Sequence, residues 1–352
     1  YISVLEMLGN QRLYGDRPID SEAQNKLKHR SIDVLIIILM FSWFAARQTF
    51  GISPDYQNYI ILFSENYKGL VEPLFALLKL IFVYFDVGIR PIIFLLSFIS
   101  LSIKYYSISK ISKYPRYLFI CYLSSFYFLY EYTQIRAALC LSIFLLSLSI
   151  YVNGKPNQAF LVCLLCPLIH FSGIIFLLFY LYLSIIKYRL LYIVVPVLFF
   201  FLAVVSSFLS LNLQYLVFGV LGMNPNTLLY NYVFPKISGL EGQINIFNKL
   251  ILLMLLMSVL YYILGEKITN QYVRMNMALI SFGIALYYAL SLFAIPVLVF
   301  RFTQYFYVST YFIMDNTLYR TKNKELAIVS YLIIALTISF LTINQIFLGA
   351  KL

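Results

Sequence analysis

The chain has 352 residues, of which 62% are hydrophobic, 18% aromatic and only 11% charged, and its mean hydropathy is +0.86. Soluble domains are about half apolar and a quarter charged, so this composition excludes a water-facing globule and predicts a polytopic membrane protein. The 26 lysines and arginines outnumber the 14 acidic residues, which gives a net charge of +12. In a membrane protein this excess indicates the positive-inside bias of cytoplasmic loops rather than nucleic-acid binding.

Apolar runs predict an all-α fold of about 11–12 transmembrane helices, since one span needs roughly 20 apolar residues. The runs leave no room for a soluble domain, so we expect a single transmembrane domain over residues 1–352. Tyr1 to Leu8 looks like the end of a span, and we expect that an N-terminal helix is truncated there. In chain order, the runs lie at residues 32–46, 91–104, 117–131, 137–151, 158–169, 172–186, 190–210, 249–264, 276–294, 302–316 and 326–348.

Basic clusters between the runs set the predicted topology. We place most of the lysines and arginines in cytoplasmic loops, including the cluster Lys104, Lys110, Lys113 and Arg116. This alternation requires one crossing between Glu72 and Lys104, so the apolar stretch at residues 72–85 is predicted to be re-entrant or interfacial. The stretch at residues 158–187 is too short for two full crossings and is predicted to turn below the membrane surface near residues 167–172. The longest outside connection, residues 211–248, is predicted to be a loop that closes over the site.

Polar residues that interrupt the apolar pattern gather on the outside face. Ionisable groups at or below the apolar boundary are costly and usually indicate a functional path. The outside set consists of Arg47, Asp55, Tyr56, Tyr59, Glu72, Gln134, Arg136, His170, Arg301 and Gln304. Each of the charged members also has a structural interpretation, with arginines reaching lipid phosphates, a hydrogen-bonded core histidine, a helix-starting Glu72-Pro73 and a turn at Asp55. Three arginines, two carboxylates and a histidine on one face favour a shared site.

This set suits phosphate chemistry. The arginines Arg47, Arg136 and Arg301 are candidates to bind a pyrophosphate and to stabilise the charge that develops as it departs. His170 is the first candidate for a general base because histidine side chains titrate nearest neutral pH. Glu72 and Asp55 are the alternative catalytic groups. The remaining members, Tyr56, Tyr59, Gln134 and Gln304, are candidate substrate-binding residues.

No metal or cofactor is predicted. The sequence contains no Walker A loop, no HExxH, no GxSxG and no acidic pair with metal-ligand spacing. Cys163 and Cys166 form a CxxC within an apolar run, without a second pair or a histidine cluster, so they are interpreted as buried thiols.

The ordered set of motifs resembles a known family. Arg47, Gly51, Asp55-Tyr56 and Tyr59, then Glu72-Pro73, Gln134-Ile135-Arg136 and His170-Phe171-Ser172, resemble the EpsG-like, Wzy-type polysaccharide polymerases of bacterial inner membranes. The resemblance covers about residues 30–310, and Arg301 also fits it. The sequence departs from the commoner pattern in a slightly longer spacing from Gly51 to Asp55 and in Ala137, where glutamine is more usual.

The resemblance implies a metal-independent glycosyltransferase that polymerises lipid-linked oligosaccharide repeat units for O-antigen (lipopolysaccharide) or capsule. Its partners would be undecaprenyl-pyrophosphate-linked oligosaccharides, the lipid bilayer and a separate chain-length regulator. It would act on the periplasmic face of the inner membrane, which makes residues 211–248 a periplasmic loop. Two alternatives stay open: a lipid-linked oligosaccharide flippase, and a membrane acyltransferase with His170 as base.

Overall fold

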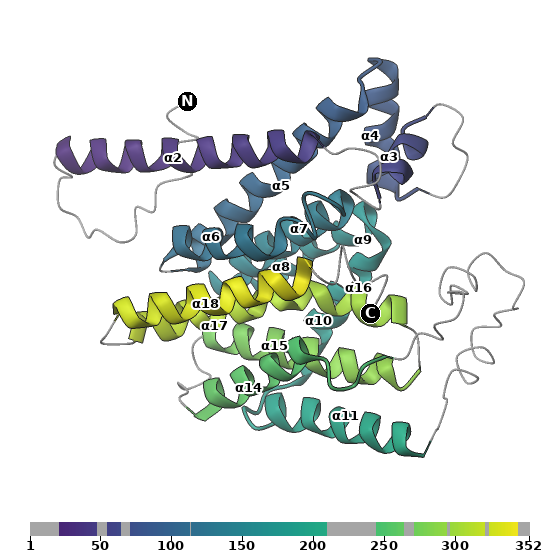
Figure 1. The fold of residues 1–352 in the computed structure, drawn as a ribbon, viewed down its shortest axis with the longest axis vertical. Coiled ribbons are helices and arrows are strands. Elements are labelled where there is room, and N and C mark those ends of the chain that lie inside the picture. The colour runs from purple at the N-terminus through teal and green to yellow at the C-terminus, as the bar shows by residue number, and fades with distance from the viewer. Residues whose placement is uncertain are drawn as a thin grey trace, which may run out of the picture. The chain divides into compact units, whose positions relative to one another are not determined.

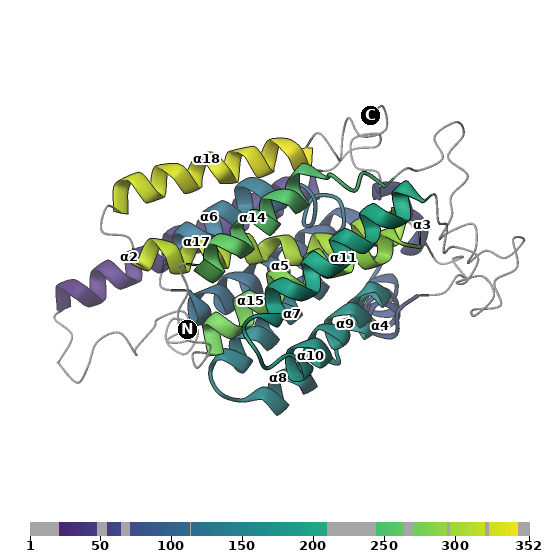
Figure 2. The same ribbon diagram turned by 90° about the horizontal axis from the view of Figure 1, so that it is seen from below.

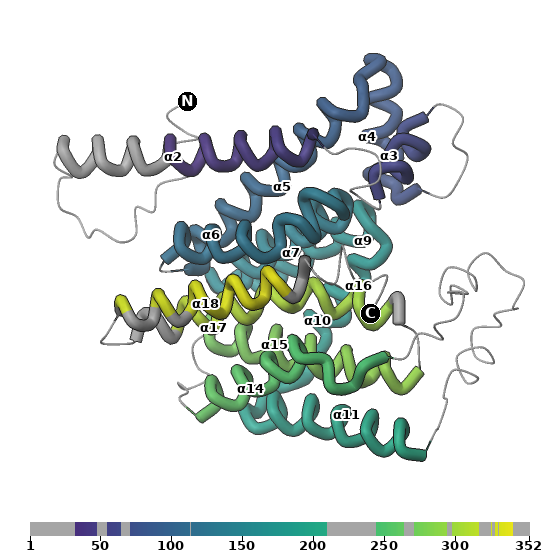
Figure 3. The backbone as a smooth tube through the Cα atoms, viewed as in Figure 1, coloured from purple at the N-terminus to yellow at the C-terminus, as the bar shows by residue number. Residues whose placement is uncertain are grey.

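The computed structural model describes residues 21–47, 55–64, 71–112, 114–209, 244–263, 271–293, 296–320 and 324–343, and Figure 3 traces their course. These ranges are helical and contain no strand, so the predicted all-α polytopic class is confirmed. Gly51, the predicted end of a truncated helix at residues 1–8 and most of the predicted loop at residues 211–248 lie outside the described residues. The membrane face of each loop stays a prediction.

Within the described ranges, four helices are long and apolar enough to cross a membrane: α5 (Ile89–Ile111), α7 (Ile135–Val152), α11 (Leu191–Phe208) and α15 (Gln271–Ser291). Further apolar helical segments are shorter, at Ile32–Ala46, Pro73–Tyr84, Pro156–Ile169, Phe171–Ile185, Lys249–Ile263 and Tyr331–Phe340. The segment predicted to be re-entrant or interfacial forms α4 (Pro73–Tyr84), with 12 residues. At 1.5 Å per residue α4 is about 18 Å long, well short of the roughly 30 Å hydrocarbon core.

The chain divides into two compact units, each described here by itself. Unit 1 comprises residues 1–177 and 314–352, and unit 2 comprises residues 178–313. Two helices, α10 (Ile174–Ile185) and α17 (Ser309–Arg320), contain the boundaries between the units. The expected single transmembrane domain stays a prediction.

Unit 1 is built around α5 and α7, which form the most extensive helix pair of the structure (Figure 1). The other elements of this unit are α2 (Ser21–Ala46), α3 (Tyr56–Leu62), α4, α6 (Pro115–Phe126), α8 (Pro156–Cys163), α9 (Cys166–Ile169), η2 (Phe171–Gly173) and α18 (Lys324–Ile343). α2 packs on α5, α8 packs on α7, and α18 lies along α6 (Figure 2). This arrangement buries most of α7, so its nearly continuous apolar sequence packs mainly against protein.

Prolines begin several helices of unit 1. Pro73, Pro115 and Pro156 occupy the first turn of α4, α6 and α8. The first turn has no intrahelical acceptor for its N–H groups, so proline costs nothing there and its fixed φ favours the helix. Pro73 places the residue before it, Glu72, at the start of α4. The helix α9 lies against α4 (Figure 2).

Unit 2 surrounds α15, which contacts α11, α14 (Lys249–Ile263), α16 (Pro296–Gln304) and η3 (Tyr305–Val308). The apolar window of α15 is 72% buried, whereas that of α11 is only 17% buried. The exposed side chains of α11 include Leu198, Phe201 and Phe208. Such a wide apolar face is what a lipid-facing span presents to hydrocarbon.

Candidate functional site

Glu72 is the centre of the candidate site. Its main-chain carbonyl accepts a hydrogen bond from the N–H of Ala76 as α4 begins. Its carboxylate is only 2% exposed, and it binds two side chains that are distant in sequence. Arg136 Nη1 donates to Glu72 Oε2 at 2.9 Å, and His170 Nδ1 lies 2.7 Å from Glu72 Oε1. Of the predicted outside residues, the structure therefore brings Glu72, Arg136 and His170 into direct contact.

Arg136 reaches Glu72 from the first turn of α7. Gln134 immediately precedes this helix, which begins at Ile135. Its guanidinium lies 6.0 Å from the Tyr59 ring centre and 5.8 Å from that of Phe75, distances typical of cation–π contacts. The side chain is 27% exposed. Arginine has five N–H donors and the bond to Glu72 uses one, so the guanidinium has further donors with which to bind an anion.

His170 lies between α9 and η2 in an extended conformation. Its N–H donates to the carbonyl of Cys166 at 3.0 Å, and its own carbonyl accepts from the N–H of Gly173 at 2.8 Å. These two bonds form the sharp turn that was predicted near residues 167–172. The turn directs the imidazole towards Glu72 while the side chain stays 18% exposed.

The protonation of Glu72 determines which ring nitrogen of His170 carries the hydrogen. Burial raises the pKa of the Glu72 carboxyl, but the hydrogen bond from His170 and the charge of Arg136 outweigh burial and lower this pKa to about 2. Glu72 is therefore ionised at neutral pH and only accepts hydrogen bonds. Nδ1 of His170 carries the shared hydrogen, and Nε2, on the other side of the ring, can exchange a proton with a substrate.

The short helix α3 supports Arg136. Tyr59 is 3% exposed, and its ring lies beside the guanidinium of Arg136 near the start of α7. Burial and the nearby carboxylate of Asp55 raise the pKa of Tyr59 well above its ordinary value, so this hydroxyl stays neutral. Asp55 lies just before α3 and accepts a hydrogen bond from Asn58 at 3.2 Å. Tyr56 is also buried.

Of the other predicted residues, Arg47 belongs to unit 1, and Arg301 and Gln304 belong to unit 2. Arg47 follows α2, is exposed, and places its guanidinium 4.6 Å from the centre of the Trp43 ring. None of the described contacts joins Arg47 to Glu72, Arg136 or His170. Arg301 and Gln304 belong to α16 in unit 2, with Arg301 exposed and Gln304 buried. Their approach to the cluster stays a prediction.

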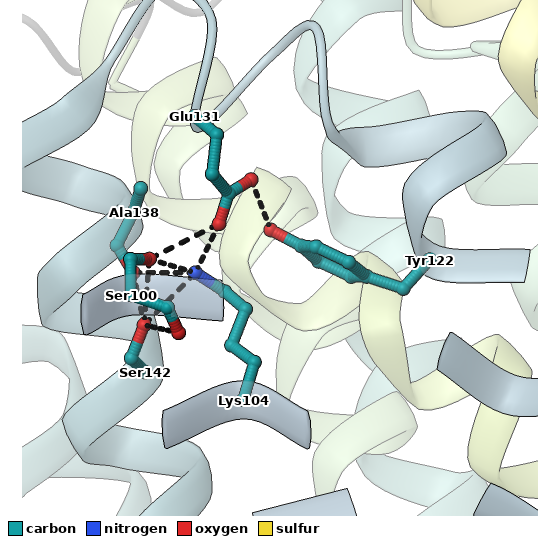
Figure 4. Close-up of polar contacts among 6 residues, drawn as sticks. All are labelled: Ser100, Lys104, Tyr122, Glu131, Ala138 and Ser142. Carbon is teal, nitrogen blue, oxygen red and sulfur yellow. Dashed lines mark hydrogen bonds and ion pairs between the residues drawn. The ribbon is translucent and has the colours of Figure 1, made fainter. Parts of the chain in front are cut away.

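A second charged cluster was missed by the sequence analysis. Lys104 was placed in a cytoplasmic loop, and this is wrong: it lies inside α5, is 0% exposed, and pairs with Glu131 at 2.6 Å (Figure 4). The apolar run was taken to end at Lys104, but α5 continues to Ile111. Ser100 precedes Lys104 by four residues, on the same face of the helix, and gave a weak signal that this part of α5 has polar partners.

Within the described part of the chain, no three His, Cys, Asp or Glu side chains come together as metal ligands would.

The fold and the site together define a polytopic, all-helical membrane protein with a buried carboxylate held between an arginine and a histidine. A family model described as the EpsG family matches residues 33–349. The chain therefore belongs to the EpsG family of Wzy-like polysaccharide polymerases, and the resemblance stated from its motifs is confirmed. Searches of curated proteins and of solved structures gave no significant match.

Proposed function

We propose that this protein is a glycosyltransferase that joins lipid-linked oligosaccharide repeat units into a polysaccharide. The donor would be a glycan on undecaprenyl pyrophosphate and the acceptor a lipid-linked repeat unit, at the periplasmic or outer face of the bacterial inner membrane. The observation that carries the proposal is the ionised Glu72 held between Arg136 and His170 in a chain of the EpsG family. A separate chain-length regulator is the expected protein partner.

The proposed reaction moves one proton and exchanges one bond. Nε2 of His170 takes the proton from an acceptor hydroxyl, and the hydroxyl oxygen bonds to the anomeric carbon of the donor. The bond from that carbon to the pyrophosphate oxygen breaks, and undecaprenyl pyrophosphate leaves with the electron pair. Glu72 orients the imidazole and stabilises its charged form, much as a buried carboxylate does in a catalytic triad.

The arginines have the complementary task at the leaving group. Arg136 is anchored by Glu72 and supported by aromatic rings, so its remaining donors are already oriented towards a phosphate. Donors that are oriented before the reaction stabilise developing charge without reorganisation. Arg47 and Arg301 are assigned to the same pyrophosphate, and Asp55, Tyr56, Gln134 and Gln304 to the sugars or to the support of the site.

The test compares polymer ladders in cells that carry Arg136→Ala, Arg301→Ala or His170→Ala. Each variant is expected to give short or absent ladders at a normal protein level. Arg90→Ala is the matched control, because Arg90 is an exposed arginine near the start of α5. Normal ladders in all three variants would contradict the proposal.

Purified protein separates the proposal from the two alternatives. With lipid-linked donor and acceptor, a polymerase releases undecaprenyl pyrophosphate and lengthens the glycan. A flippase forms no new bond, and an acyltransferase requires an acyl donor. Release that depends on His170 would support the polymerase, whereas transport without release would favour a flippase.

A further inference from the structure

A fully buried ion pair lies in the core of unit 1, outside the contacts that form the candidate site. Figure 4 shows the ammonium group of Lys104 among oxygen atoms from α5 and α7 and from the segment that precedes α7. Lys104 Nζ donates to Glu131 Oε1 at 2.6 Å, to Ser100 Oγ and the carbonyl of Ala138 at 2.7 Å, and to Ser142 Oγ at 2.9 Å. Both charged side chains are 0% exposed.

The carboxylate of Glu131 is also held on its other side. Its Oε2 accepts a hydrogen bond from the hydroxyl of Tyr122, on α6, at 2.8 Å (Figure 4). Ser142 in turn donates to the carbonyl of Ser100 at 3.0 Å. The cluster thus connects α5, α6, α7 and the segment between α6 and α7 through charge-assisted hydrogen bonds.

Such a pair needs a reason other than stability. The cost of removing two charges from water largely cancels their attraction, and buried pairs are often replaceable by apolar residues without loss. Their best-attested use is to fix the register of packed elements. Charged groups inside membrane helices are likewise rare and usually functional. Lys104 and Glu131 are therefore expected to hold a particular local geometry.

Two hydrogen-bond partners of Lys104 lie on either side of Arg136 in the sequence. Glu131 precedes Arg136 by five residues, and Ala138, whose carbonyl also binds Lys104, follows it by two. The ammonium group of Lys104 therefore binds the chain both before and after Arg136. The side chain of Arg136 extends from the first turn of α7 to Glu72.

We propose that Lys104 and Glu131 are positioning residues that fix the first turn of α7, so that Arg136 pairs with Glu72 and presents its remaining donors to the pyrophosphate. The catalytic part of this inference rests on the proposed function. Neither residue needs to contact the substrate, because both act through Arg136.

The key variant removes both charges at once. Lys104→Met/Glu131→Gln leaves no unpaired buried charge, whereas either single change would leave one and would destabilise the fold for that reason alone. Ser112→Ala is the matched control: it removes two other hydrogen bonds of unit 1, from Ser112 Oγ to Asp315 and from the Tyr114 N–H to Ser112 Oγ, and leaves α7 untouched. We expect the double variant to lower kcat/KM about 100-fold relative to this control, since a displacement of about 1 Å has an effect of that size.

A thermal double-mutant cycle tests the positioning role without an activity assay. Arg136→Ala and Glu72→Gln, alone and together, are compared in the wild-type protein and in the double variant, using the Tm of the purified full chain. In the wild type the Tm loss of the combined change is smaller than the sum of the two single losses, because both changes break the same ion pair. This shortfall is the overlap. In the double variant we expect the overlap to fall below half its wild-type size. A cluster that only stabilises the core would lower every Tm and leave the overlap unchanged.

Each outcome is decisive. Loss of the overlap together with low kcat/KM supports the inference, and an unchanged overlap with control-like kcat/KM overturns it. If the double variant does not fold, the same cycle is made with Ser142→Ala, which removes one bond of Lys104 at little cost in volume. If Arg136→Ala, Arg301→Ala and His170→Ala all keep full polymerase activity, the proposed function fails, while the Tm cycle still tests the positioning.

Discussion

Gly173 offers the sharpest test of how the fold places His170. It ends η2, three residues after His170, and packs directly on the backbone of α9. A Cβ atom added at this position would lie 2.6 Å from the Cys166 carbonyl carbon, 2.7 Å from its oxygen and 2.8 Å from Cys140 Sγ. Ordinary contacts of a Cβ begin at 3.4 Å. Gly173→Ala therefore requires η2 and α9 to separate by about 0.8 Å, the difference between 3.4 and 2.6 Å.

The displacement falls on His170, the proposed general base. The Cys166 carbonyl that the new methyl group would contact also accepts the hydrogen bond from the N–H of His170. Separating η2 from α9 therefore moves the imidazole relative to Glu72. A shift approaching 1 Å at a reacting group costs about 10- to 100-fold in rate, and overpacking a core costs about 1–3 kcal/mol in stability. We expect a loss of activity far larger than the loss of folded protein.

The assay is release of undecaprenyl pyrophosphate by the purified full chain, with Tm measured on the same samples. Gly88→Ala is the matched control, because no atom lies within 4 Å of a Cβ at Gly88, and its φ of −61° suits alanine. Adding Cys140→Ala to Gly173→Ala removes the thiol contact but not the backbone contacts, so activity should stay low. The reasoning is refuted if Gly173→Ala matches Gly88→Ala in both rate and Tm.

Two further predictions concern Arg136 and Glu72. Arg136→Lys keeps a positive charge near Glu72 but lacks the planar fork, so it should lower kcat/KM about 10- to 100-fold with little change in Tm, as measured with lipid-linked donor. Glu72→Gln should lower the Tm at neutral pH, because an ionised Glu72 with a pKa of about 2, below its ordinary 4.5, stabilises the fold above pH 4.5 and loses this effect as pH falls towards 2. The Tm difference from wild type should persist at pH 5 and shrink below pH 4.5; a difference that vanishes by pH 5 would contradict the lowered pKa.

The contact of Glu72, Arg136 and His170 was within reach of the sequence. Counting basic loops placed all three on one membrane face, and each interrupts an apolar pattern at a helix end. Residues that lie on one membrane face need not contact one another, however. The pairing depends on how closely α4, α7 and α9 pack, and no single segment encodes that distance. The role of Glu72 as the partner of His170, rather than its rival as base, required the structure.

The burial of Lys104 could not be predicted from the sequence, for a physical reason. A lysine near the end of an apolar run has the same local pattern whether it faces water or a buried acid. Its environment is decided by Glu131, 27 residues later, and by the close packing of α5 on α7. Periodicity and loop charge describe one segment at a time, so they identify neither partner of such a pair. Gly173 was missed for the same reason, since its neighbours Cys166 and Cys140 belong to α9 and α7.

The pairing with Glu72 also changes what Arg136 contributes to the proposed site. An ionised carboxylate at 2.9 Å compensates its charge, so Arg136 attracts a distant anion weakly and acts mainly as an oriented donor at close range. A pyrophosphate carries several negative charges, so net attraction must come from cations without such a close acid. Arg47, exposed and 4.6 Å from the centre of the Trp43 ring, fits that task in the proposal. Arg47 then attracts the carrier, and Arg136 orients its leaving group.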